Sequence, residues 1–440
     1  MERIAVLGTG MSAFGAAHRL AGEQVEVVLY DKASFFGGQT TSFRSPQGFI
    51  FDKGPHVSFT KDERIQNLMA EAVDGQFQTV QYHLENYWKS HRLPHPVQTN
   101  MHGLPVDVMA KVVADFAAQS NEQREIRNYR DWLIVAYGSY FAEQFPVQYT
   151  KKYHTTDPVN LTTDWIGPRM YRPSLEEMLR GALAPATNNV HYITGFRYPT
   201  NGGFMSYLEK WAKAATMQLN HEVVHIDPRS RTLRFANGKT TGYDGLVSSI
   251  ALPDLIPLIE GVPDDVIEAV ARLACSGCVL VNIGVRRTDL SNAHISYFYD
   301  SDIVFSRASI PHLMSPNNVP PGCGSVQAEV YFSKKYLPLS GRPEDFLQPV
   351  IRDLKRCGIL REEDDIVFTD VKLCEYANVI FDHDRTEALR TVHGFLDDIA
   401  VRHCGRYGDW GYMWTDESYK SGESAATRAL GDLGKRPATA

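Results

Sequence analysis

Residues 4–13 read IAVLGTGMSA and residues 25–31 read VEVVLYD, and these two stretches decide the fold of this 440-residue chain. The first is an apolar run that ends in a Gly-x-Gly-x-x-Ala turn, followed by the small residues of a closely packed helix. The second is another apolar run, and it ends in Asp31, roughly 20 residues after the turn. This order of strand, glycine turn, helix, strand and acid predicts a βαβ unit that binds an adenine dinucleotide.

Each position of the turn has a physical role in such a unit. Gly8 permits the tight turn, Gly10 leaves room for the backbone to approach a pyrophosphate, and Ala13 lets the helix pack closely on the sheet. The N-terminus of that helix faces the phosphate charge. We therefore predict that the dinucleotide site contains Gly8, Gly10, Met11, Ser12, Ala13 and Asp31.

A second pair of glycines helps to distinguish between NAD and FAD, the two common adenine dinucleotides. Residues 31–40 read DKASFFGGQT and residues 48–56 read GFIFDKGPH, whereas an NAD dehydrogenase would continue through further βα repeats. These segments resemble the flavoprotein superfamily of amine oxidases, protoporphyrinogen oxidases and UDP-galactopyranose mutases. The resemblance implies an FAD cofactor, with the glycine pair close to it and the Gly-Pro-His segment beside the isoalloxazine ring. It adds the following residues to the FAD site: Lys32, Gly38, Gln39, Gly54, Pro55 and His56.

Composition and charge exclude several other classes of protein. The net charge of −7 forms no basic stripe for nucleic acid, and no apolar run approaches the roughly 20 residues of a membrane span. Six unevenly spaced cysteines suit a reducing compartment. Because the first strand begins close to Met1, we expect no signal peptide and a cytoplasmic protein. The oligomeric state stays open.

Length and patterning predict an α/β protein of more than one domain. We expect a discontinuous, doubly wound Rossmann-type FAD-binding domain in residues 1–60, 215–255 and 400–430. Residues 61–214 are predicted to form a mainly helical insertion, with helices at 65–72, 105–119, 128–143 and 174–183. Residues 256–399 are predicted to form an antiparallel-sheet substrate domain, with helix from Phe346 onward. Residues 431–440 are predicted to be a disordered tail.

Two short stretches match known metal or redox motifs, and both are interpreted as structural. His221 and His225 spell His-Glu-x-x-His, but the β-branched residues between them predict a strand, which holds the two rings about 13 Å apart. We therefore predict no metal site. Cys275 and Cys278 spell Cys-x-x-Cys and are interpreted as small core residues at the start of a strand. In the flavin superfamily a strand hairpin lies at residues 221–238, so Val224 is expected against the adenine end of FAD.

Further resemblances favour the mutase branch of the superfamily. Residues 165–169, WIGPR, and residues 305–307, FSR, stand where mutases carry arginines that meet the substrate pyrophosphate. Residues 405–412, GRYGDWGY, are similar to a mutase segment, and the helix after it is expected to face the flavin. By this resemblance the catalytic residues are His56, Arg169, Arg307 and Tyr412. It also adds the following residues to the FAD site: Gly405, Arg406, Asp416, Glu417 and Ser418.

Two functions remain open at this stage. In the first, reduced FAD attacks the anomeric carbon of a nucleotide sugar and interconverts pyranose and furanose, as in surface-polysaccharide or antibiotic-sugar pathways. In the second, FAD takes a hydride from an amine or a saturated carbon, in a tunnel lined by Tyr297, Phe298, Tyr299 and Phe305. The sequence departs from the mutases around Tyr376, where a Tyr-Pro segment is missing, and around His95. We prefer a small-molecule substrate of the nucleotide-sugar class.

Overall fold

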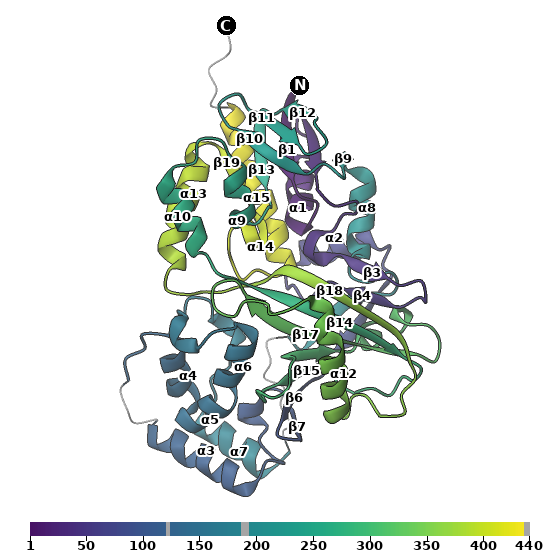
Figure 1. Ribbon diagram of the computed structural model, residues 1–440, viewed down its shortest axis with the longest axis vertical. Coiled ribbons are helices and arrows are strands. Elements are labelled where there is room, and N and C mark those ends of the chain that lie inside the picture. Colours follow the sequence, from purple (N-terminus) through teal and green to yellow (C-terminus); the bar gives the residue numbers. More distant parts are fainter. Residues whose placement is uncertain (120–123, 186–192, 435–440) are drawn as a thin grey trace.

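The computed structural model describes residues 1–119, 124–185 and 193–434 (Figure 1). A five-stranded sheet contains the nucleotide-binding unit predicted at the N-terminus, and every neighbouring pair of its strands runs parallel. Its strands, in spatial order, are β19 (Val401–His403), β13 (Gly245–Ser248), β1 (Glu2–Leu7), β2 (Val25–Tyr30) and β9 (Met217–Gln218). The sheet thus combines three segments that are far apart in the chain.

Two helices pack against this sheet and against each other at glycines. They are α1 (Met11–Leu20) and α15 (Thr415–Gly434). A Cβ added at Gly15 would lie 2.1 Å from the carbonyl oxygen of Tyr419, and one at Gly422 would lie 1.8 Å from that of Ser12. Both positions therefore require glycine. Because α15 runs to Gly434, the expected tail was wrong for residues 431–434, and residues 435–440 lie outside the described residues.

A small antiparallel sheet confirms the predicted hairpin. It consists of β10 (Val223–Asp227), β11 (Thr232–Phe235) and β12 (Thr240–Gly242), and the Asn237-Gly238 turn joins the last two. His225 lies within β10 and its ring is 3.1 Å from Glu260, while His221 precedes the strand. The His-Glu-x-x-His sequence is therefore not helical.

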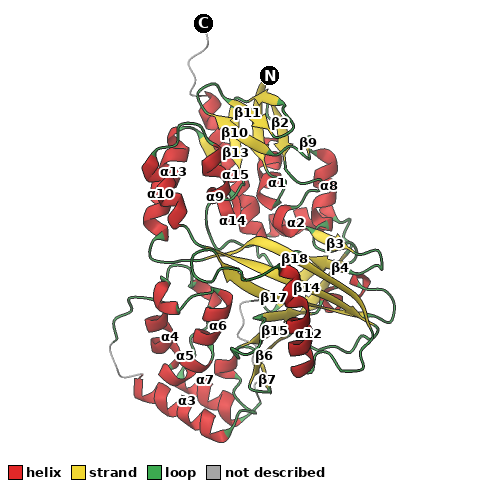
Figure 2. Ribbon diagram, in the orientation of Figure 1, coloured by secondary structure: helices red, strands yellow, loops and turns green. Residues whose placement is uncertain are grey.

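A seven-stranded sheet lies at the centre of the molecule (Figures 1 and 2). Its order is β18 (Ile366–Val379), β14 (Cys275–Val285), β17 (Gly324–Ser333), β16 (Arg307–Ser309), β15 (Ile295–Phe298), β6 (Leu84–Trp88) and β7 (His91–Pro94). Its strands pair antiparallel, except that β15 and β6 run parallel. The sheet is thus mixed, and its edge comes from the region expected to be helical.

The expectation of helix from Phe346 onward was only partly right. Helix α12 (Leu347–Arg356) follows a turn at Pro343–Phe346, and α13 (Arg385–Asp398) comes later. Between them lies β18, the 14-residue strand that pairs with β14 along most of its length. Its sequence, IVFTDVKLCEYANV, is rich in β-branched residues, which favour a pleated surface over a helix.

The helices of residues 63–214 form two groups, one beside the parallel sheet and one at the lower end of the molecule in Figure 1. They are α2 (Glu63–Ala72), α3 (Val106–Gln119), α4 (Tyr129–Tyr137), α5 (Ser139–Gln144), α6 (Pro146–Tyr153), α7 (Leu175–Leu183) and α8 (Ser206–Ala214). Figure 2 shows α3 to α7 gathered as one helical lobe. The single helix expected over 128–143 is broken at Gly138, whose φ of 80° is outside the helical region.

Short elements complete the fold. Two-stranded pairs are formed by β3 (Ser42–Arg44) with β4 (Ile50–Asp52) and by β5 (Phe77–Gln81) with β8 (Gly195–Pro199). The remaining helices are α9 (Leu252–Leu255), α10 (Asp264–Arg272), α11 (Pro311–Met314) and α14 (Gly405–Gly408). Within the described ranges, no helix combines the length and the apolar character needed to cross a membrane.

Candidate active site

A cavity of about 1110 Å³ extends from the glycine turn of the parallel sheet to the helical lobe. Most of the predicted FAD residues line it, and they come from the N-terminal third and from the C-terminal segment around α14. These residues are Gly8, Gly10, Met11, Ser12, Asp31, Lys32, Gly38, Gln39, Gly54, Pro55, His56, Gly405, Arg406 and Ser418. The predicted catalytic residues Arg169, Arg307 and Tyr412 line the same cavity.

The glycine turn leaves the backbone exposed to the cavity. Gly8 has φ +111°, and a Cβ there would lie 2.1 Å from the Ser249 hydroxyl, so only glycine fits without strain. Gly38 faces Gly10 across the turn, since a Cβ on Gly38 would lie 3.2 Å from the Cα of Gly10. Asp31 directly follows β2, and its carboxylate accepts a 2.6 Å hydrogen bond from the Thr9 hydroxyl.

Four residues of the predicted FAD site do not line the cavity. Ala13 is fully buried in the core between α1 and the sheet, where it serves helix packing. Val224 is 39% exposed, and the neighbouring Val223 lines the cavity instead, because successive side chains of a strand point to opposite faces. Asp416 and Glu417 lie in the first turn of α15, where the Glu417 carboxylate accepts a hydrogen bond from the Trp414 backbone N–H at 2.7 Å. They therefore belong to the helix end rather than to the cavity wall.

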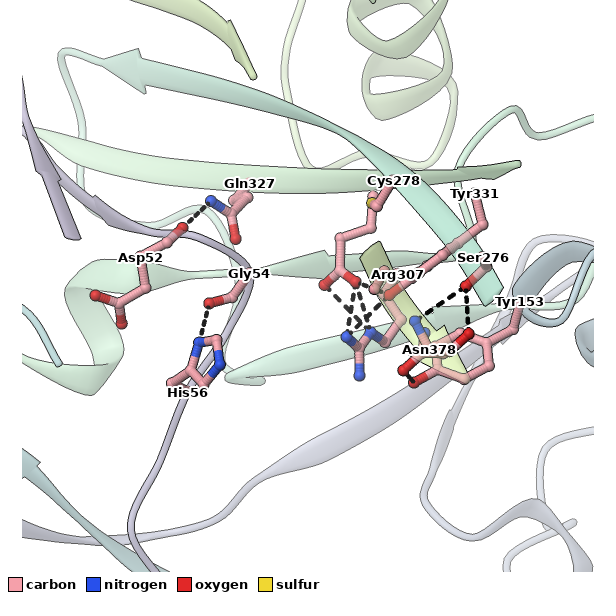
Figure 3. A network of polar contacts seen from close by, with 12 residues as sticks. Asp52, Gly54, His56, Tyr153, Ser276, Cys278, Arg307, Gln327, Tyr331 and Asn378 are labelled. Carbon is pink, nitrogen blue, oxygen red and sulfur yellow. Dashed lines mark hydrogen bonds and ion pairs between the residues drawn. The ribbon is translucent and has the colours of Figure 1, made fainter. Parts of the chain in front are cut away.

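His56 is held in a neutral form beside the cavity. Its Nδ1 lies 2.8 Å from the carbonyl oxygen of Gly54 (Figure 3). A carbonyl only accepts, so Nδ1 carries the proton and Nε2 is left as an acceptor. Burial lowers the pKa of His56 to about 4, despite the hydrogen bond to Gly54.

Arg307 points into the cavity but is paired with a buried carboxylate that the sequence analysis did not identify. Its Nη2 lies 2.7 Å from Glu329 Oε2, and Nε contacts both carboxylate oxygens. Tyr331 donates to the same carboxylate and lies beside Arg307 in Figure 3. Glu329 follows Arg307 by 22 positions and is brought to it by the pairing of β16 with β17, a relation that no local motif reveals.

Arg169 and Arg406 are different, because among the described residues neither forms an ion pair. Both guanidinium groups lie over the ring of Tyr412, at 4.8 and 4.6 Å from its centroid. Arg169 donates to the backbone oxygens of Trp165 and Tyr412, and Arg406 donates to the backbone oxygen of Met413 and to Asn378. The Nε atom of each arginine is buried, and it has no hydrogen-bond partner in the part of the chain that the structure describes.

Aromatic side chains also line the cavity. Tyr297 and Tyr299 line the cavity as expected, whereas Phe298 and Phe305 do not. Both phenylalanines are buried in a separate core cluster. Phe298 points away from the cavity because it alternates with Tyr297 along β15, whereas Phe305 precedes β16. Tyr153, which no sequence motif indicates, also lines the cavity, and its hydroxyl forms hydrogen bonds with Tyr412 at 3.0 Å and Asn378 at 3.1 Å.

The Cys-x-x-Cys pair is structural in its placement. Cys275 begins β14, and Cys278 is buried further along the same strand, as a core interpretation requires. Both thiols are free. Burial raises the pKa of Cys275 to about 12, which makes a reactive thiolate unfavourable.

Comparison with known proteins shows the fold of the whole chain. A family model described as an NAD(P)-binding Rossmann-like domain matches residues 6–72. A crystal structure of reduced UDP-galactopyranose mutase is similar over 99% of this chain and 98% of that one, with 23% identity and a TM-score of 0.92. A candidate protoporphyrinogen oxidase from Exiguobacterium sp. 255-15 is similar over 99% of both chains, with 14% identity and a TM-score of 0.75.

A double mutant of putrescine oxidase is similar over 98% of this chain and 99% of that one, with 14% identity and a TM-score of 0.64. The chain therefore has the fold that these mutase and oxidase structures share, with a Rossmann-like dinucleotide-binding unit at its N-terminus.

Proposed function

We propose that this protein is an FAD-dependent enzyme that acts on a nucleotide-activated sugar and interconverts its pyranose and furanose forms. The observation that carries the proposal is the pair of arginines, Arg169 and Arg406, that flank Tyr412 in the cavity without an acidic partner in the described chain. Partly buried guanidinium groups are stabilised by an anion, and each can bind a diphosphate through paired charge-assisted hydrogen bonds.

The glycine turn fits the pyrophosphate of FAD. Gly8 and Gly10 leave backbone rather than side chain at the cavity, at the point where the N-terminus of α1 begins. The same cavity continues past His56 to Tyr412, so a cofactor and a substrate have room in one enclosure. When bound and reduced, FAD supplies a nucleophilic nitrogen for the anomeric carbon of a sugar.

His56 contributes a neutral acceptor rather than a charge. With its proton on Nδ1, the free Nε2 accepts a hydrogen bond from a donor placed beside the Gly-Pro-His segment. This orientation requires no change of protonation near neutral pH, because the pKa of His56 lies at about 4 through burial.

Arg307 is less available to bind the diphosphate than the sequence indicates. Glu329 neutralises its charge, and Nε and Nη2 are already engaged. We propose that Arg169 and Arg406 provide the net positive charge for the diphosphate, while the pair of Arg307 and Glu329 shapes the wall of the cavity.

The experiment is calorimetric titration of the dithionite-reduced, FAD-loaded protein with UDP. We expect Arg169→Ala to weaken binding at least tenfold, because a bidentate, charge-assisted contact is lost. The matched control is Arg172→Ala, which removes an exposed arginine three residues along that does not line the cavity. Equal UDP affinity in the wild type and in Arg169→Ala would refute the diphosphate assignment.

A further inference from the structure

A bulge in β18 borders the cavity. This strand is the edge of the seven-stranded sheet and lies against α14 (Figure 1). Where its pairing with β14 shifts, residues 375–377 of β18 stand opposite the single residue Gly277. All three bulge residues line the cavity. Because a bulge bends its strand and re-aims side chains, often next to an active site, the position of Tyr376 is set by this irregularity.

The Tyr376 side chain connects the central sheet with the dinucleotide-binding unit. Its hydroxyl donates a 2.7 Å hydrogen bond to Asp254 Oδ1, in the short helix α9 that follows β13. Burial and this hydrogen bond raise the pKa of Tyr376, so the hydroxyl keeps its proton and remains the donor. The hydroxyl of Tyr407, in α14, lies 3.0 Å from the backbone oxygens of Tyr376 and Ala377. Two elements next to the parallel sheet therefore hold the bulge.

Hydrogen bonds join four segments at the edge of the cavity into a closed ring. The segments are residues 7–9, 37–39, 249–254 and 374–376, and each contributes residues to the cavity wall. Two of the links lie within the dinucleotide-binding unit. The Ser249 hydroxyl donates to the carbonyl oxygen of Leu7, and the Gly37 backbone N–H donates to that of Thr9, both at 2.9 Å.

The strand β18 supplies the other two links of the ring. The thiol of Cys374 lies 3.3 Å from Gln39 Oε1, and Tyr376 donates to Asp254. A thiol is a weak donor, whereas a hydrogen bond from a phenol to a carboxylate is charge-assisted. The bond between Tyr376 and Asp254 is therefore the stronger of these two links. Since the ring includes the glycine turn and Gln39, it borders the part of the cavity that fits the dinucleotide.

We propose that Tyr376 and Asp254 form a latch that retains FAD. Their hydrogen bond closes the ring beside the glycine turn, and it has to open before the cofactor leaves. The inference rests on the FAD-binding part of the proposed function and is independent of the sugar chemistry. Both are positioning residues, because they hold two walls of the cavity together.

The test follows the release of FAD from the loaded, oxidised protein after dilution, by the rise in flavin fluorescence. Tyr376→Phe should release FAD about three- to tenfold faster, because the packing of the ring beside Tyr407 is kept and only the hydrogen bond is lost. Asp254→Ala should have the same effect. Asp254→Asn keeps an acceptor oxygen and should restore part of the retention.

A double variant tests whether the two residues act through one contact. Tyr376→Phe/Asp254→Ala should release FAD no faster than either single variant, because each single change already removes the shared hydrogen bond. Effects that multiply in the double variant would overturn the latch, since the residues would then act independently.

The matched control is another tyrosine bonded to an aspartate. Tyr336 donates to Asp382 at 2.8 Å, and neither residue lines the cavity. Tyr336→Phe should leave the release rate unchanged, and thermal unfolding checks that each variant is folded. A release rate in Tyr376→Phe equal to that of the wild type overturns the latch alone, and so does equal acceleration by Tyr336→Phe. A wild type that retains no FAD overturns the FAD site and the inference with it.

Discussion

Arg169 and Arg307 show how far single residues can be interpreted without a structure. Both were predicted at the substrate site, and both line the cavity. Their partners differ, since Arg307 pairs with the 2%-exposed side chain of Glu329 and Arg169 pairs with no acid in the described chain. The sequence predicts both arginines at the site but not the contact of Arg307 with Glu329, because that contact depends on the pairing of β16 with β17.

Arg307→Ala is therefore expected to lower stability more than Arg169→Ala. Removing one partner of a buried ion pair leaves the charge of Glu329 uncompensated, at a cost of about 3–5 kcal/mol in the free energy of unfolding. Urea denaturation measures this loss. The double variant Arg307→Ala/Glu329→Gln should recover part of the stability, and a double variant no more stable than Arg307→Ala would contradict the account.

At the scale of elements, the glycine turn, α1 and the first two strands follow from the sequence because their pattern is local. The strand β18 does not, since its residues range from buried to exposed without strict alternation and it was placed in a helical region. The interruption of the helix at Gly138 and the pairing of β6 near the sheet edge were not predicted, for a similar reason. Each depends on tertiary packing that overrides a local signal.

The packing of α15 on α1 gives a prediction for two glycines of one helix. Gly422→Ala places a methyl group 1.8 Å from the carbonyl oxygen of Ser12 and must push the helices apart, at a cost of about 1–3 kcal/mol. Because α1 begins at the glycine turn, FAD retention should weaken as well. Thermal unfolding and the absorbance of the retained flavin measure the two effects.

Gly431→Ala is the matched control on the same helix. Nothing lies within 4 Å of a Cβ at Gly431, so the change should leave stability unaltered or raise it by about 0.5–1 kcal/mol through helix propensity. Equal destabilisation by the two substitutions would show that the contact between the helices is not the cause.

At the scale of the whole molecule, buried neutral histidines link stability to pH. Burial lowers the pKa of His154 to about 3 and of His56, His294 and His393 to about 4. Asp52 opposes them, because burial raises the pKa of its carboxyl group to about 6. The histidines outnumber this one carboxyl group, so their effect dominates between pH 6.5 and 4.

The free energy of unfolding should therefore fall as the pH is lowered from about 6.5 to about 4. In that window the unfolded chain binds protons at these histidines and the folded chain does not, which costs up to about 1.4 kcal/mol per pH unit for each histidine that stays neutral. Urea denaturation at a series of pH values measures the slope. His294→Phe should make the slope shallower, whereas His383→Phe, at an exposed position, should leave it unchanged; an unchanged slope in His294→Phe would disprove the linkage.

The central claim is that a sugar reacts at a reduced flavin in this cavity. The most direct measurement is the mass of the flavin released after the dithionite-reduced protein is treated with cyanoborohydride and a panel of UDP-, GDP- and dTDP-sugars. The account predicts a flavin heavier by one hexose or deoxyhexose with at least one member of the panel. Unmodified flavin throughout, with bleaching of the oxidised protein by an amine, would contradict it and favour an oxidase.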